Sequence, residues 1–524
     1  MPAVTLAAAH FAEGTVALAA AVAAAGVLVL REPRSRALAM PLALVLAAGA
    51  VGWLSASTIN DEIEARAALL AVAGAVGLVA LLALAVLFHR RPAWLVLLAI
   101  AALPFRIPVP TGNDDTASLL LPLYLVIAAG CAAHVWRAWR GAGEGDREEP
   151  RVRRLTQALA VMVVLYAAQA LYSADAEHAV KTLGFFLVPF AVLFRLLVEV
   201  RWSRRLLLQA LGVTVGLALL FAAVGFAEWA TGRLLISNEK VLAANDLKPY
   251  FRVNSLFFDP NVYGRFLALV MVVLAGVLLW APARRDVTRV AVALALLWAA
   301  LVLTLSESSF AALIVGLAVL AALRWRPGPV VAIAGVVVAA AVAVVLLAPS
   351  AIGLKTDSFS SINEASSGRA KLLRGGARLA ADRPLTGFGS GSFADRYRAR
   401  ERVVSSRLSA ESHTIPVTIA AEQGAIGLVA YAVLLWTAFG VAFGGLRRTL
   451  RRRRAGVVLV GRCVVAAAFC ALLLHTFVYA AFLEDPLTWT LLAMACALRR
   501  VEPEGAGAED AAAYPAGHRE PVPT

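Results

Sequence analysis

Long apolar runs alternate with short polar connections from the start of the sequence to about residue 498. A helix that crosses a bilayer needs about 20 apolar residues, with a range of about 17–25. This pattern predicts an all-α, multi-pass membrane protein. A window of that length predicts about fifteen transmembrane helices, at about 14–30, 37–55, 67–88, 93–104, 118–135, 155–172, 179–198, 206–226, 262–280, 287–304, 310–323, 330–348, 415–443, 464–482 and 486–498.

The positions of the arginine clusters predict which side of the membrane each loop faces. Cytoplasmic loops carry an excess of Lys and Arg, and outer loops do not. The opposite connections here, among them "NDEIEAR" and "FLEDP", are mostly acidic. We therefore predict an outer N-terminus and a cytoplasmic C-terminus. The clusters expected in the cytoplasm follow alternate segments: Arg31/Arg34/Arg36, Arg90/Arg91, Arg137 to Arg154, Arg201 to Arg205, Arg284/Arg285, Arg324/Arg326, Arg447 to Arg454 and Arg499/Arg500.

The composition agrees with a membrane protein. Of the 524 residues, 61% are hydrophobic and only 16% are charged, whereas soluble domains are about 45–50% apolar. The formal net charge is +15, but most arginines lie between apolar runs, so we expect no nucleic-acid partner. The four cysteines show no metal-ligand spacing, and we interpret them as small core residues.

Two outer connections are longer than the rest and divide the chain into regions. They run over about 228–261 and 349–414, and the second carries more basic than acidic residues. The predicted regions are N-terminal helices over 1–104, a transmembrane core over 118–348, a large external loop over 349–414, C-terminal helices over 415–498 and a cytoplasmic tail over 499–524. The composition of the tail, rich in Pro, Gly, Ala and Glu, predicts disorder.

The stretch "YFRVNSLFFDPNVYGRF" (250–266) combines a turn with two arginines. Asp259, Pro260 and Asn261 are turn residues, and Asn261 is expected to cap the following helix. Arg252 precedes the turn at the outer surface. Arg265 lies about one turn inside the helix, where a charge must find a partner or reach the membrane surface. A capped helix with interfacial arginines is the simpler interpretation of this stretch.

The stretch "SSGRAKLLRGGARLAADRPLTGFGSGSF" (366–393) pairs basic residues with a glycine-rich turn. It lacks the features of a phosphate-binding loop, and a flexible turn is the simpler interpretation. A basic helix beside such a turn would nevertheless suit an anionic headgroup, because guanidinium groups match phosphate oxygens in pairs. The basic residues at near-helical spacing are Arg369, Lys371, Arg374 and Arg378, and the glycines are Gly387, Gly389 and Gly391.

The stretch "ESHTIPVTIAAEQGAIG" (411–427) places His413 immediately before an apolar helix. Thr414 or Ser412 is expected to cap this helix, with Pro416 in its first turn. His413 would then face the outside at a helix N-terminus, where the dipole keeps an imidazole neutral and able to accept a proton. A structural role is the commoner one for a lone histidine.

Further polar residues lie within the predicted helices. Glu422 is nine residues beyond His413, on the opposite face of the helix, and it is expected to be functional or paired with an arginine. Gly424 and Gly427 are predicted as packing positions for a neighbouring helix. Glu307, among serines, and His475 are expected to line an internal cavity without a catalytic role.

These motifs, in this order, resemble those of the O-antigen ligase and O-antigen polymerase superfamily of integral-membrane glycosyltransferases. The resemblance covers roughly 155–498 and rests on Arg252 before "FFDPN", "SSGR" at Arg369, "RPLTGFGSGSF" and "HTIPVTIAAEQGAIGLVAY". It implies a core of about twelve helices, so the first three would be additional, and an external loop with short helices. Two departures stand out. Ser306-Glu307-Ser308-Ser309 replaces a common Ser-Arg pair, and the acidic Asn60 to Glu62 is not a family feature.

The resemblance implies an enzyme of the bacterial inner membrane that moves a glycan from a polyprenyl pyrophosphate donor to a hydroxyl of a glycan or lipid acceptor, without a metal or cofactor. Arg252 and Arg369 would stabilise the pyrophosphate, and His413 would be the general base. Membrane lipids are the other expected partners. The further substrate-binding residues implied are Arg265, Asn261, Asp259, Arg374, Gly387, Gly389 and Glu422.

Two other functions are consistent with the sequence. Asn60 to Glu62 resembles the acidic first-loop motif of polyprenyl-phosphate sugar transferases, in which Asp61 or Glu62 would be the base. A polysaccharide or lipid exporter, with arginines along its passage, is the alternative outside enzymes. The choice between polymerase and ligase, and the oligomeric state, stay open.

Overall fold

The computed structural model describes residues 2–54, 56–110, 116–141, 148–236, 241–242, 245, 250–280, 284–325, 328, 369–401, 414–452, 456–479 and 481–501. The predicted helix over 330–348, much of the external loop over 349–414 and the tail beyond residue 501 lie outside these residues. So does His413.

The described residues are almost entirely helical. The first part of the chain forms α1 (Pro2–Val29), α2 (Pro33–Leu54), α3 (Ala56–Arg90), α4 (Ala93–Ala102), α5 (Leu121–Trp139), α6 (Pro150–Ala170), α7 (Ala176–Thr182), a π-helical turn (Leu183–Leu187), α8 (Val188–Glu199) and α9 (Arg204–Thr231). The second part forms α11 (Pro260–Trp280), α12 (Arg284–Thr304), α13 (Glu307–Arg324), α16 (Arg369–Asp382), α17 (Phe393–Glu401), α18 (Ile415–Phe443), α19 (Leu446–Arg452), α20 (Val457–Val478) and α21 (Pro486–Ala497).

Each predicted transmembrane segment within the described residues coincides with a helix. Ten of these helices are long and apolar enough to cross a membrane, and three shorter apolar helices accompany them. Helix α6, which begins with three arginines, is not among either group. These findings confirm a helical, multi-pass architecture, and the count of about fifteen stays a prediction.

Two local features differ from the sequence prediction. An antiparallel hairpin of β1 (Ile107–Pro110) and β2 (Thr116–Leu119) joins α4 to α5 and was not predicted. Asn60 to Glu62, expected in an external loop, belong to the first turns of the 35-residue helix α3. Nothing in that segment breaks a helix, so α3 extends through the polar residues.

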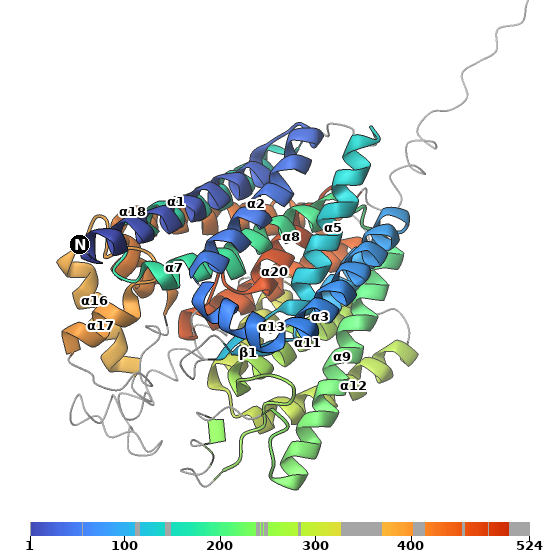
Figure 1. The fold of residues 1–524 in the computed structure, drawn as a ribbon. Coiled ribbons are helices and arrows are strands. Elements are labelled where there is room, and N and C mark those ends of the chain that lie inside the picture. The colour runs from blue at the N-terminus through green and yellow to red at the C-terminus, as the bar shows by residue number, and fades with distance from the viewer. Residues whose placement is uncertain are drawn as a thin grey trace, which may run out of the picture.

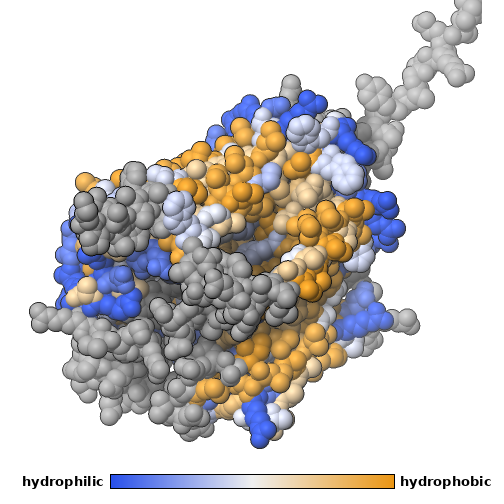
Figure 2. Space-filling view, viewed as in Figure 1, coloured by the Kyte–Doolittle hydropathy of each residue, from blue (hydrophilic) through white to orange (hydrophobic). Residues whose placement is uncertain are grey.

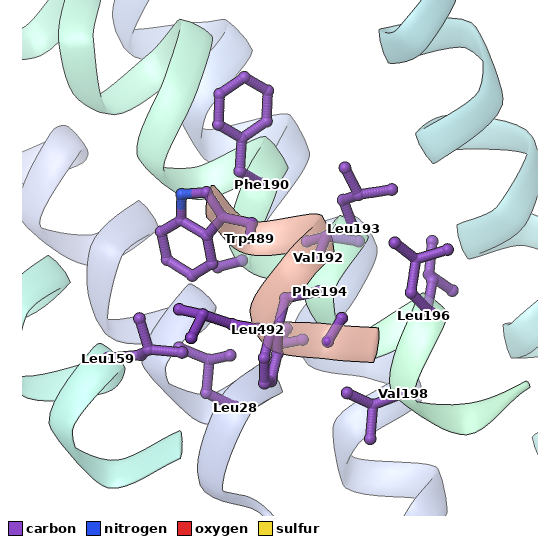
Figure 3. Close-up of a cluster of buried hydrophobic side chains, with 14 of the residues drawn as sticks. Leu28, Leu159, Phe190, Val192, Leu193, Phe194, Leu196, Val198, Trp489 and Leu492 are labelled. Atoms are coloured by element: carbon purple, nitrogen blue, oxygen red, sulfur yellow. The ribbon is translucent and has the colours of Figure 1, made fainter. Parts of the chain in front are cut away.

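The apolar core lies between α8 and the helices around it. Every residue of α8 from Val188 to Val198 is buried, as expected of a helix that is apolar on all sides. Trp489 of α21 packs beside Phe190 and Phe194 (Figure 3), and its indole nitrogen donates to the carbonyl of Leu483 at 2.8 Å. The core therefore joins the C-terminal helices to the first half of the chain.

The surface carries a broad apolar belt. Figure 2 shows apolar surface across the bundle, with hydrophilic surface over α16 and α17 at the left, where Figure 1 places these two helices at one edge. Large apolar side chains are exposed on several helices, among them Val76 of α3 at 63% and Trp436 of α18 at 81%. Continuous exposed apolar surface of this kind indicates contact with lipid.

One end of the bundle collects arginines and carboxylates from alternate helix ends. Arg36 of α2 and Arg195 of α8 reach Glu199 at 2.6 and 2.9 Å, and His134 of α5 reaches it at 2.7 Å. Arg499, after α21, donates to Glu149 at 2.7 Å. We call this the arginine-rich end. Its composition agrees with the predicted alternation of the helices.

The opposite end is where α11, α13, α18 and α21 begin and α12 and α20 finish. We call it the site end. Polar side chains from these helices contact each other there, as described below. The predicted motifs therefore lie at the site end, and the arginines paired with Glu199 and Glu149 lie at the arginine-rich end.

Candidate functional site

Arg252 lies at the site end between the finish of α12 and the start of α11. Its Nε donates to the carbonyl oxygen of Thr304 at 2.9 Å, and its Nη2 donates to Oδ1 of Asn261 at 3.1 Å. Both acceptors are neutral, and the side chain is half-buried. Within the described part of the chain, no carboxylate forms an ion pair with this guanidinium.

Glu228, near the end of α9, accepts hydrogen bonds from the backbone of the segment that carries Arg252. Glu228 is only 1% exposed. One carboxylate oxygen accepts the N–H of Leu235 at 2.9 Å, and the other accepts those of Asn254 at 3.1 Å and Ser255 at 2.7 Å. Sequence reasoning took Glu228 only as the start of a loop. The available signal was an acidic residue at the end of an apolar helix.

The start of α11 differs from the prediction in one detail. Asp259, not Asn261, provides the helix cap, because its Oδ1 accepts the N–H of Asn261 at 2.6 Å. Pro260 then occupies the first helical position, where a missing N–H has no cost. The Asn261 side chain is consequently free to accept the hydrogen bond from Arg252.

Arg265 lies one turn further into α11 and is 3% exposed. Its Nη2 is 2.6 Å from Oδ2 of Asp485, which is also buried and caps α21 through the N–H of Leu487. This confirms that a charge at this depth needs a partner, and the partner, Asp485, was not predicted. The Nε and Nη1 groups of Arg265 have no hydrogen-bond partner among the described residues.

A buried serine cluster joins α13 to α20. Oγ of Ser306 lies 2.8 Å from Oγ of Ser309 and 3.3 Å from that of Ser308, which is 3.2 Å from Nε2 of His475. His475 is therefore part of the buried cluster. Glu307, expected to line the same cavity, is exposed.

Arg369 is the first residue of α16, which lies against α18 and α17. The buried side of α16 is formed by Leu372, Gly375, Gly376 and Leu379. Lys371, Arg374 and Arg378 are exposed on the other side, as the spacing predicted.

The glycine-rich turn packs on a break in α18. Glu422 of α18 is 7% exposed, and its two carboxylate oxygens accept the N–H groups of Gly391 at 2.9 Å and Phe393 at 3.0 Å. Its backbone carbonyl accepts the N–H of Gly389 at 2.8 Å. Glu422 was expected to contact substrate or an arginine, and this geometry supports a structural role.

Gly424 breaks α18 within its length, at φ 63° and ψ −158°. This conformation is essentially restricted to glycine. Past the break, the N–H groups of Ala425 and Ile426 donate to the carbonyls of Pro384 and Leu385 at 2.8 and 3.3 Å. Gly424 was predicted to pack against a neighbouring helix. It instead admits the backbone of the turn, since a Cβ there would collide with the carbonyl of Leu385.

The connection between α6 and α7 covers the other side of the turn. The hydroxyl of Tyr172 donates to the carbonyl of Thr386 at 2.8 Å, and that of Ser173 donates to the carbonyl of Ser390 at 2.7 Å. Gly389, at φ 96°, leaves no room for a side chain beside Ser173. Gly387 and Gly389 therefore allow close packing on both sides, and the turn is not a flexible one.

Helix α18 begins after Thr414, which occupies the cap position, with Pro416 in the first turn. The Thr414 side chain does not cap the helix as predicted. Its hydroxyl donates to the carbonyl of Phe477 at 3.1 Å, near the end of α20 and two residues after His475. Thr414 follows the predicted base His413 directly in the sequence. The start of α18 is thus connected to the helix that carries the buried imidazole.

The fold and this site together define a multi-pass membrane protein with a buried polar centre at one end of its helices. Residues 291–432 match the family model described as O-Antigen ligase. This part of the chain is therefore similar to the O-antigen ligase family, which supports the resemblance found in the sequence. The matched range runs from α12 into α18, and so includes the serines of the cluster and the glycine-rich turn but neither Arg252 nor His475. No curated protein matches the chain.

Proposed function

We propose that the protein transfers a glycan from a polyprenyl pyrophosphate donor to an acceptor hydroxyl at the outer face of the cytoplasmic membrane. The observation that carries this proposal is the environment of Arg252. Its guanidinium lies where α11 and α13 begin, and it contacts only neutral acceptors within the described residues. A guanidinium without a carboxylate partner is available to an anionic ligand.

A pyrophosphate is the anion that best fits this chemistry. It leaves with the electrons of the bond to the anomeric carbon. Negative charge grows on the oxygen that joined this carbon to phosphorus as the bond breaks. Guanidinium groups fixed beside that oxygen stabilise the transition state. Arg252 and Arg369 would supply these groups. Because two cations neutralise the leaving group, we propose that no divalent metal is required.

His413 would act on the other reactant. The acceptor hydroxyl forms the new glycosidic bond to the anomeric carbon, and His413 takes up its proton. The donor is anchored in lipid by its polyprenyl chain, so the reacting bond lies at the membrane surface. This accounts for a base beside the start of a transmembrane helix. The outer face is proposed for the site end because the arginine-rich end would be cytoplasmic.

The test is a transfer assay with the purified protein in detergent and a polyprenyl pyrophosphate-linked glycan. Arg252→Lys should reduce kcat about 10²–10³-fold, the range for loss of one fixed donor to a developing anion, because an ammonium lacks the paired donor geometry. Arg500→Lys, at the arginine-rich end, is the matched control and should keep near-normal activity. Chelation of divalent metal should change the rate little. An Arg252→Lys enzyme as active as Arg500→Lys would contradict the proposal.

A further inference from the structure

The backbone of Arg252 is fixed by a second polar side chain, in addition to the support from Glu228. Oδ1 of Asn245 accepts the N–H of Arg252 at 3.1 Å, and its Nδ2 donates to the carbonyl of the same residue at 3.2 Å. One amide side chain thus satisfies both backbone groups of Arg252, as a neighbouring strand would. The position of its Cα is therefore determined independently of the guanidinium contacts.

Glu228 fixes the residues that follow Arg252. Its carboxylate accepts three N–H groups, from Leu235 on one side and from Asn254 and Ser255 on the other. A carboxylate has about four acceptor sites and no donor, whereas an amide or a hydroxyl would place a donor against an N–H. Ser255 lies in the left-handed region at φ 54°, so this backbone conformation depends on such bonds.

We infer that Glu228 and Asn245 are positioning residues for Arg252. They fix the backbone of Arg252 where its guanidinium can donate to Thr304 and Asn261. This position would place the guanidinium beside the leaving group. Neither residue needs to touch substrate. This inference rests on the proposed function for the role of Arg252, but the clamp itself is a property of the loop. A displacement of about 1 Å in a reacting group can cost about a hundredfold in rate, so a small loosening should be visible in kinetics.

The chain offers a matched control in Glu422. This second buried glutamate also accepts backbone N–H groups with both oxygens, but it supports the glycine-rich turn and not Arg252. Glu228→Gln and Glu422→Gln remove the same charge from buried sites of similar chemistry. A general loss of stability should affect both variants alike. Only Glu228→Gln should alter the loop around Arg252.

The first experiment measures amide hydrogen exchange of the full-length protein in detergent, without substrate. Glu228→Gln should increase exchange at least about tenfold over residues 250–256, and Glu422→Gln should leave that segment unchanged. This readout holds whatever the protein transfers, so it separates failure of the clamp from failure of the proposed function. Equal exchange over 250–256 in the wild type and Glu228→Gln would overturn the inference.

The second experiment is a double-mutant cycle in the transfer assay. Glu228→Gln should lower kcat/KM about tenfold to a hundredfold in the wild type, but less than about threefold in an Arg252→Ala background, because coupled residues are not additive. Glu422→Gln should lower it by the same factor in both backgrounds. If Glu228→Gln does not fold, Asn245→Ala takes its place in the same cycle. Full additivity of the folded variant with Arg252→Ala would show a purely structural role.

Discussion

The two ends of the bundle use arginines and carboxylates in opposite ways. At the arginine-rich end, Glu199 meets Arg36 and Arg195, and Glu149 meets Arg499. At the site end, Glu228 accepts backbone N–H groups, and Arg252 donates to neutral oxygens. Ion pairs occur at this end too, between Arg265 and Asp485 and, on α16 and α17, between Arg378 and Glu401.

This difference separates charges that hold the fold from charges that remain available. Arg252 is half-buried, and an anionic ligand would supply the charge that balances its guanidinium. Glu228 lies beside the segment that carries Arg252, but its carboxylate accepts backbone N–H groups and not the guanidinium. The comparison supports the proposal that Arg252 meets an anionic ligand.

The largest expected effect concerns the side of the membrane on which each end lies. A cysteine at Arg378, which is exposed on α16, should react fully with an impermeant thiol reagent added outside intact cells. A cysteine at Arg448, exposed in α19, should react only after permeabilisation. The background would lack Cys131, Cys463, Cys470 and Cys496. The opposite labelling would place the site end in the cytoplasm and remove access to an outer-leaflet donor.

The second expected effect concerns His413. His413→Ala should lower kcat about 10²–10⁴-fold, the usual contribution of a general base, with expression and donor binding retained. His413→Asn should be equally impaired, since an amide cannot accept the proton. The wild-type rate should fall as pH drops through the pKa of the imidazole, because the charged ring has no free electron pair. His134→Asn, at the arginine-rich end, is the matched histidine control and should remain active. A His413→Asn enzyme within a few-fold of the wild type would end the assignment of His413 as base.

The helices were predictable because each depends on a local apolar run. The site was predictable only in part. Arg252 and Arg265 stood out as charges beside a turn, but their partners could not be found from local sequence. Asp485 is 220 residues from Arg265, and Ser390 is 217 residues from Ser173. The break at Gly424 was missed for the same reason, since its cause is the backbone at Leu385 and not the sequence of α18.

A smaller effect is expected from the break in α18. Gly424→Ala should destabilise the protein by about 1–3 kcal/mol from backbone strain alone, and more from the collision with Leu385. Gly440 lies in the same helix with open space around it, so Gly440→Ala should be neutral or slightly stabilising. Unfolding of both variants in detergent measures the difference. Equal stability would mean that the turn does not depend on this break.

The smallest expected effect tests the arginine-rich end. The hydrogen bond from Arg499 holds the pKa of Glu149 below its usual 4.5. A carboxyl whose pKa is lowered by folding stabilises the protein at pH values above its pKa in the unfolded chain. This contribution disappears as pH falls through its pKa in the folded protein. The Glu149 side chain is 38% exposed, so the pair should contribute no more than about 1 kcal/mol. The difference in unfolding free energy between the wild type and Glu149→Gln should therefore be constant at neutral pH and vanish in acid below the lowered pKa.

Transfer activity at neutral pH should be unchanged in Glu149→Gln, because this end holds the fold and does not meet the donor. A pH-independent difference in stability would show that the pair acts through packing, and a loss of activity would remove the functional contrast between the two ends.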